Sequence, residues 1–203
     1  MGNADQTTQH HAAMSADEGQ PPLLLSPTTL RGLHLRNRIV VSPMCQYASS
    51  EGAPSDWHLV HLGKFALGGA GLVFGEETAV QASGRKTYGC AGIYTDAHVA
   101  AYRRITDFIH AGGAAAGIQL GHAGRKASCG APWTNFKPLT EADALEGRPP
   151  WRGVSASELA AKPGALTPMA LDASQIRVMI QTWRTAALRS LDAGFDVCEI
   201  HGA

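Results

Sequence analysis

Four places in the sequence combine an apolar segment with side chains that can carry chemistry. Cys45 and Tyr47 follow the first segment, Glu77 follows the second, Gln119 closes the third and His201 closes the fourth. The Gln119 amide can both donate and accept hydrogen bonds. The Cys45 thiol can interact with a redox group or fill space as a small hydrophobe. These groups form one site if the fold brings the four segment ends together.

The elements around these residues alternate between two periodicities. Short apolar segments have the length and composition of buried strands, and longer segments between them have helical spacing. Because helices separate the strands, we expect parallel pairing with right-handed crossovers. The expected strands are 38–43, 71–74, 115–120 and 195–200, the expected helices are 55–67, 95–111 and 174–193, and a hairpin with Gly32 at its turn precedes them.

Two α/β architectures fit this order, a doubly wound sheet and a (β/α)8 barrel. The glycine-rich phosphate motif of the doubly wound fold is absent after the first strand. Polar residues gather at the carboxyl ends of the strands, where a barrel has its active site. We therefore predict a (β/α)8 TIM barrel. A complete barrel needs eight strands and about 250 residues, so we expect these 203 residues to hold its N-terminal half, as a truncated fragment.

Two segments lie outside this alternation. Residues 1–22 show no periodicity and are predicted to be a disordered arm. Residues 128–171 contain several prolines together with Trp133 and Trp151. A loop of this length is usually functional or disordered, and its tryptophans predict that it packs as a cap over the barrel mouth.

Composition narrows the function classes. Lys plus Arg and Asp plus Glu each number 17, so the formal net charge of zero argues against a nucleic-acid partner. No apolar run approaches the roughly 20 residues of a membrane-spanning helix, and no signal peptide is evident, so a cytoplasmic location is expected. The four cysteines are far apart and are expected to be thiols. His58 and His61 lack an obvious third ligand, so no metal site is expected.

Four motifs resemble the Old Yellow Enzyme family, most closely its bacterial branch with a cysteine beside the flavin, which includes the xenobiotic reductases. They occur in the family's order at 37–47 (NRIVVSPMCQY), 71–80 (GLVFGEETAV), 117–127 (GIQLGHAGRKA) and 193–201 (AGFDVCEIH). The resemblance implies bound FMN and reduction of the activated C=C bond of α,β-unsaturated carbonyl compounds. NADPH or NADH would supply the hydride, and the complete enzyme is expected to form homo-oligomers.

The resemblance also assigns flavin contacts. The main chain at the end of the first strand and the Gln119 amide would meet the flavin edge, with Cys45 tuning the ring; otherwise Gln119 is an ordinary interior polar residue. The second strand departs from the family, because Glu77 stands where a small residue is usual, and its carboxylate is expected to point away from the ring. The implied flavin-binding residues are Ser42, Pro43, Met44, Cys45, Glu77 and Gln119.

Substrate contacts follow from the same motifs. His201 would donate a hydrogen bond to the substrate carbonyl oxygen, which becomes enolate-like as hydride arrives. Tyr47 would contact the substrate or plug the mouth, and Lys126 would approach flavin or substrate or remain a solvated cation. The family's second donor and proton-donating tyrosine would lie beyond Ala203, so we expect little activity from these residues alone. A dienoyl-CoA reductase-type flavoenzyme and a non-catalytic half-barrel remnant are the alternatives.

Overall fold

A parallel sheet organises the chain, as the alternation of periodicities predicts. The computed structural model describes residues 22–202. The main strands pair in chain order, β3-β4-β6-β9, with β5 beside β4, and every pairing in this sheet is parallel. Sequential parallel pairing is the arrangement of a (β/α)8 barrel. The strands are β3 (Val40–Val41), β4 (Leu72–Ala79), β5 (Ala91–Gly92), β6 (Ala115–Gly121) and β9 (Val197–Ile200).

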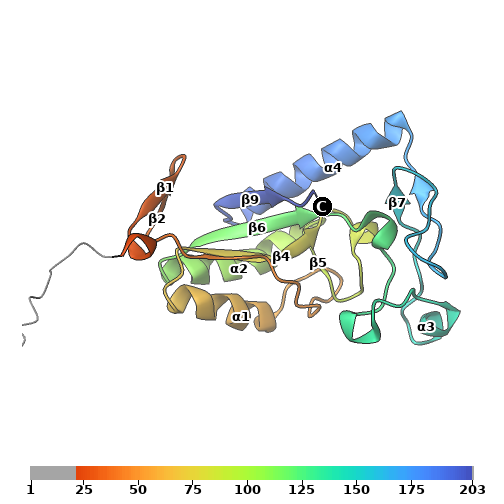
Figure 1. Ribbon diagram of the computed structural model, residues 1–203, viewed down its shortest axis with the longest axis horizontal. Coiled ribbons are helices and arrows are strands. Elements are labelled where there is room, and N and C mark those ends of the chain that lie inside the picture. Colours follow the sequence, from red (N-terminus) through yellow and green to blue (C-terminus); the bar gives the residue numbers. More distant parts are fainter. Residues whose placement is uncertain (1–21, 203) are drawn as a thin grey trace, which may run out of the picture.

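Three long helices pack on this sheet in one core. They are α1 (Asp56–Leu67), α2 (Asp96–Ala111) and α4 (Ala173–Asp192), each within two residues of its expected bounds. Figure 1 shows α1 and α2 along β4 and β6 and α4 beside β9. The apolar side chains of the helices form this core with outward-facing strand residues such as Val73 and Ile118, both fully buried. The chain therefore forms the sheet and outer helices of a partial barrel.

The N-terminal caps explain where the helices begin. Asp172 accepts hydrogen bonds from the main-chain N–H groups of Ser174 and Gln175 at the start of α4. At the start of α2 the cap is Thr95. Thr95 has extended backbone geometry, which a cap requires, whereas Asp96 is already helical and places its charge in the first turn.

The opposite face of the sheet is closed at one end by the predicted hairpin. Strands β1 (Thr28–Leu30) and β2 (Leu33–Leu35) pair antiparallel. Leu35 is 2% exposed and packs with Leu72, Phe74 and Ala115, whose side chains point to the barrel interior. The hairpin and the 3-10 turn η1 (Leu23–Leu25) lie at the amino ends of the strands (Figure 1).

A bulge in β4 sets the direction of the side chains beyond it. Phe74 pairs with Gly117 and Glu77 pairs with Gln119, so β4 advances three residues where β6 advances two. One extra residue reverses the alternation of inward and outward side chains. Consequently Glu77 faces the interior, and Glu76 faces the helices.

The long insertion lies at the carboxyl ends of the strands, at the far end of the molecule from the hairpin (Figure 1). Trp151 anchors it by donating from Nε1 to the carbonyl of Ser83, at 3.1 Å, in the turn η2 (Ala82–Gly84). The arm predicted at 1–22 lies outside the described residues except for Pro22. The turn η3 (Gly124–Lys126) precedes the insertion, which contains η4 (Pro132–Thr134), α3 (Glu141–Leu145), β7 (Val154–Ser155) and β8 (Met169–Ala170).

Candidate functional site

The first part of the site is the segment that follows β3. Ser42 and Met44 are exposed, Pro43 and Cys45 are half-buried, and the segment leads directly from the sheet to the mouth. Burial raises the pKa of the Cys45 thiol to about 12, with the charges of Glu76 and Glu77 adding to the effect. The Cys45 side chain therefore stays a neutral thiol near neutral pH and can act as a hydrogen-bond donor.

Tyr47 ends this segment in a constrained conformation. Its φ of 55° lies in the left-handed region, which costs a non-glycine residue about 1 kcal/mol or more. Gly89 lies so close to Tyr47 that a Cβ on Gly89 would overlap the Tyr47 carbonyl oxygen. The Tyr47 ring packs edge-on against Trp133 and Phe136 of the insertion, at centroid distances of 6.2 and 6.1 Å. The insertion thus fixes Tyr47 at the mouth.

A row of polar side chains crosses the interior face just below the mouth. Glu77, Gln119 and Glu199 are aligned across β4, β6 and β9 by the strand register. The Gln119 amide donates from Nε2 to Oε1 of Glu199 at 2.5 Å, which fixes its orientation. The Glu77 side chain lies over Gly121, where a Cβ would collide with the carboxylate.

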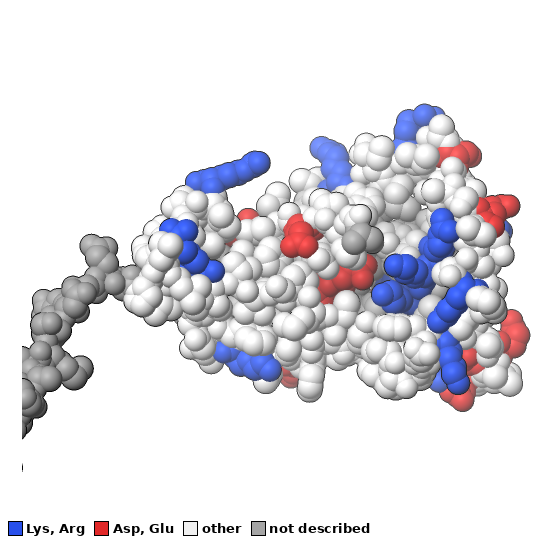
Figure 2. Space-filling model, viewed as in Figure 1, with Lys and Arg blue, Asp and Glu red and all other residues white. Residues whose placement is uncertain are grey.

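Above this row the strand ends form a small cavity of about 260 Å³. Glu77 and His201 line it from the sheet, and Lys86, Arg125 and Lys126 line it from the loops. On the face shown in Figure 2, Lys and Arg side chains gather at the insertion end beside acidic atoms. The Glu77 carboxylate therefore faces a mainly positive rim. The His201 main-chain N–H is bonded to the Leu120 carbonyl at 2.9 Å.

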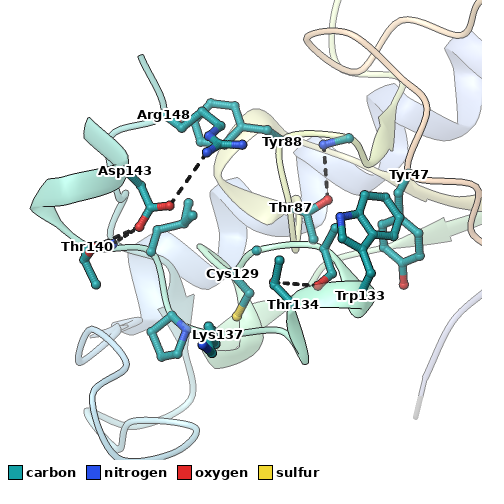
Figure 3. A pocket seen from close by; sticks show the side chains of 15 residues that line it. Tyr47, Thr87, Tyr88, Cys129, Trp133, Thr134, Lys137, Thr140, Asp143 and Arg148 are labelled. Carbon is teal, nitrogen blue, oxygen red and sulfur yellow. Dashed lines mark hydrogen bonds and ion pairs between the residues drawn. The ribbon is translucent and has the colours of Figure 1, made fainter. Parts of the chain in front are cut away.

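A second cavity, of about 440 Å³, lies between the insertion and the barrel rim. Figure 3 shows Tyr47 and Trp133 on one side of it and an ion pair on the other. In that pair Arg148 lies 4.0 Å from Asp143, whose side chain also accepts from Thr140. Tyr47 thus lines this cavity and also ends residues 42–47 after β3, which we call the Cys45 segment.

Two interactions that support the site could not be predicted from the sequence motifs. Glu199 orients Gln119, and a buried pair of His58 and Glu76 lies beneath the Cys45 segment. An i, i+3 spacing suggested that His58 and His61 should be considered together. In the structure the two rings separate, since His61 stacks on Trp57, and no cluster of metal-ligating side chains occurs within residues 22–202.

The chemistry of this donor set fits a flavin edge. The Gln119 amide, the neutral Cys45 thiol and the main chain of 42–45 offer both donors and acceptors, as alternating N–H and C=O groups require. Gly117 and Gly121 flank Gln119 on the interior face of β6 and add no side chains beside its amide. The Glu77 carboxylate lies over this face against Gly121, and Glu199 lies beside Gln119, so the face carries two carboxylates. That the Glu77 side chain points away from the flavin ring stays a prediction.

The sequential sheet, the helices on one face and the polar carboxyl edge define a partial (β/α)8 barrel with a flavin-type site. The chain belongs to the NADH:flavin oxidoreductase / NADH oxidase family, whose model matches residues 23–203. This membership confirms the predicted family and barrel. FMN and a nicotinamide hydride donor, which were predicted here, are the cofactors of this family of oxidoreductases.

Individual relatives agree with the family match. A curated NADH:flavin oxidoreductase of Gibberella zeae is 39% identical over 181 residues, which are 89% of this chain and 43% of the relative. A morphinone reductase in complex with tetrahydroNAD superposes with a TM-score of 0.72 at 28% identity, over 90% of this chain and 50% of that one. The Old Yellow Enzyme of Trypanosoma cruzi gives 0.71 at 28% identity, over 89% and 51%. The chain spans about half the length of these relatives.

Proposed function

We propose that this chain forms the flavin-binding half of an FMN-dependent reductase of α,β-unsaturated carbonyl compounds that uses NADPH or NADH. The observation that carries the proposal is the convergence of the Cys45 segment, Gln119 and His201 at the carboxyl edge of one parallel sheet. Membership in a flavin oxidoreductase family supports it. Morphinone reductase, one of the similar proteins, is named for reduction of a carbonyl compound.

Different residues of this chain contact different parts of the cofactor. The main chain of Ser42, Pro43 and Met44 and the Gln119 amide hold the cofactor edge, while the neutral Cys45 thiol donates to the ring. When bound, FMN supplies the hydride that nicotinamide has delivered to it.

The substrate is held at the mouth. His201 donates to its carbonyl oxygen, and Tyr47, fixed by the insertion, closes one side. Lys126 and the neighbouring cations favour an anionic group near the rim.

Location in the cytoplasm and assembly into homo-oligomers stay predictions from the sequence. Among the helices of the described part of the chain, none has the length and hydropathy to span a bilayer.

The proposal is tested by flavin retention. The 203-residue chain is purified, mixed with FMN and desalted, and the visible flavin spectrum of the protein fraction is measured. We expect flavin to remain bound. Gln119→Leu should raise the Kd for FMN at least about tenfold, because a flavin group would lose its buried hydrogen-bond partner.

The control is Gln181→Leu, the same chemical change on the exposed surface of α4, and it should leave the Kd unchanged. Complete loss of flavin from the unaltered chain on desalting would show that the residues named here do not suffice to hold FMN.

A further inference from the structure

A buried pair of a histidine and a carboxylate lies directly beneath the Cys45 segment. His58, on α1, and Glu76, on β4, approach to 3.0 Å between Nε2 and Oε1, and their side chains are 4% and 3% exposed. Ser49 places its hydroxyl 3.3 Å from the same His58 nitrogen. A carboxylate this deeply buried is costly unless its oxygens are hydrogen-bonded, so its partners have to be accounted for.

The hydrogen bonds of His58 fix its role in the pair. Its Nδ1 accepts the main-chain N–H of Ser55 at 2.9 Å, which caps helix α1. A ring that accepts at Nδ1 carries its proton on Nε2. His58 therefore donates from Nε2 to Glu76 and connects the start of α1 to strand β4.

The second oxygen of Glu76 reaches the site. Its Oε2 accepts the main-chain N–H of Gln46 at 3.1 Å. The Gln46 side chain strengthens the same attachment, because its Nε2 donates to the Met44 carbonyl at 2.8 Å and its Oε1 accepts from Trp57 at 3.2 Å. Two hydrogen bonds thus tie Gln46 to β4 and α1, one from its main-chain N–H to Glu76 and one from Trp57 to its side chain.

We propose that Glu76 and His58 are positioning residues, which hold the Cys45–Gln46 segment in place through the Gln46 N–H and set the charge environment of the Cys45 thiol. The contact between this segment and a flavin depends on the proposed function. The attachment itself is a property of the chain.

Two observations show why such a restraint is needed. Tyr47, the next residue, is held in the left-handed region with φ of 55°, so the segment stores strain that its neighbours must resist. Burial raises the pKa of the Cys45 thiol most, the charges of Glu76 and Glu77 raise it further, and a main-chain hydrogen bond of Glu77 lowers it. A fixed Glu76 charge thus adds to the effect of burial in keeping Cys45 a neutral donor.

Hydrogen exchange of the Gln46 amide tests the positioning role in the unliganded chain. In Glu76→Ala this amide loses its acceptor, and we expect it to exchange roughly 10- to 100-fold faster, as for a hydrogen bond to a charged group. Glu76→Gln keeps an acceptor oxygen at the same place. It should restore most of the protection, within about threefold of the unaltered chain.

The chain offers a matched control in helix α2. His98 caps this helix as His58 caps α1, with Nδ1 facing the Thr95 N–H, but its Nε2 meets the Glu51 main-chain carbonyl rather than a carboxylate. His98→Ala should weaken α2 without altering Gln46 exchange, whereas His58→Ala should accelerate it. Equal Gln46 exchange in Glu76→Ala and His98→Ala would overturn the proposal.

A second measurement reads the charge. Alkylation of Cys45 by iodoacetamide at about pH 9 is followed by peptide mass spectrometry, with the exposed Cys198 as internal reference. Removal of the negative charge in Glu76→Gln should lower the Cys45 pKa by about one unit and speed its alkylation about tenfold. An unchanged rate would remove Glu76 from this role. Neither readout requires FMN, so failure of flavin binding would leave this inference standing on its own test.

Discussion

At the scale of single residues, one inserted position decides which of two adjacent glutamates enters the site. Without the bulge after Phe74, strand alternation would turn Glu76 inward and Glu77 toward the helices. With it, Glu76 pairs with His58 under the sheet, while Glu77 lies over Gly121 on the interior face. The two carboxylates then act on the Cys45 thiol from two sides and raise its pKa.

Glu77→Ala tests the consequence of the inward position. The Glu77 carboxylate covers part of the interior face of β6 and brings negative charge to a site proposed to take an anionic cofactor. Its removal should therefore tighten FMN binding, by roughly tenfold for a repulsion of about 1.4 kcal/mol. Fluorescence titration of FMN measures the Kd. Glu158→Ala, in the exposed part of the insertion, is the control, and weaker binding by Glu77→Ala would contradict the prediction.

At the scale of elements, apolar periodicity predicted the helices well. It did not predict which of their faces are buried. The bounds of α1, α2 and α4 follow from apolar spacing and from glycines at their ends. Yet Trp57 and Val60, two large apolar residues of α1, are 57% and 70% exposed. Apolar spacing cannot distinguish the side that meets the sheet from the side that meets a neighbouring helix.

The candidate site shows the same division. Parallel pairing of β3, β4, β6 and β9 places the segments that carry Cys45, Gln119 and His201 at one edge, because parallel strands have their carboxyl ends together, and the roles of these residues stay predictions. The direction of Glu77 depended on a bulge between Phe74 and Glu77, for which Gly75 inside the strand was the available sequence signal. The His58–Glu76 pair joins residues 18 positions apart, and such a pairing follows only from the packing of α1 on β4.

Histidines attached to these elements predict the pH dependence of stability. Burial lowers the pKa of His61 on α1, His98 on α2 and His122 after β6 below the ordinary value of 6.5. The unfolded chain therefore takes up protons first, and the free energy of unfolding falls as pH drops through about 6.5. Each histidine contributes a slope of at most about 1.4 kcal/mol per pH unit.

Urea unfolding at pH values between about 7 and 5 measures this slope. His122→Gln should reduce it, because one group with a lowered pKa is gone. Asp172→Asn is the control, because the hydrogen bonds of this cap lower its pKa from 3.8 and its titration lies below the window. Asp172→Asn should lower the free energy of unfolding by the same amount at each pH in this range. A slope unaffected by His122→Gln would contradict the assignment.

At the scale of the whole molecule, the partial barrel leaves large apolar surfaces uncovered. The relatives are about twice as long as this chain. Edge strand β9 exposes Ile200, and the adjacent helix α4 exposes Ile176, Val178, Ile180 and Leu191, each by about half or more. Monomeric proteins rarely present contiguous apolar surface of this kind beside an open sheet edge.

We therefore expect the 203-residue chain to associate with itself in solution through α4 and β9. Burial of one such side chain contributes about 1.5–3 kcal/mol, so Ile180→Lys combined with Leu191→Lys should shift the chain toward monomer by a large factor in the association constant. Sedimentation velocity over a range of concentrations measures this shift. Leu145→Lys is the matched control, because Leu145 is 92% exposed on the distant helix α3 and its replacement should leave association unchanged. If the unaltered chain sediments as a monomer throughout, the exposed faces of α4 and β9 do not drive association.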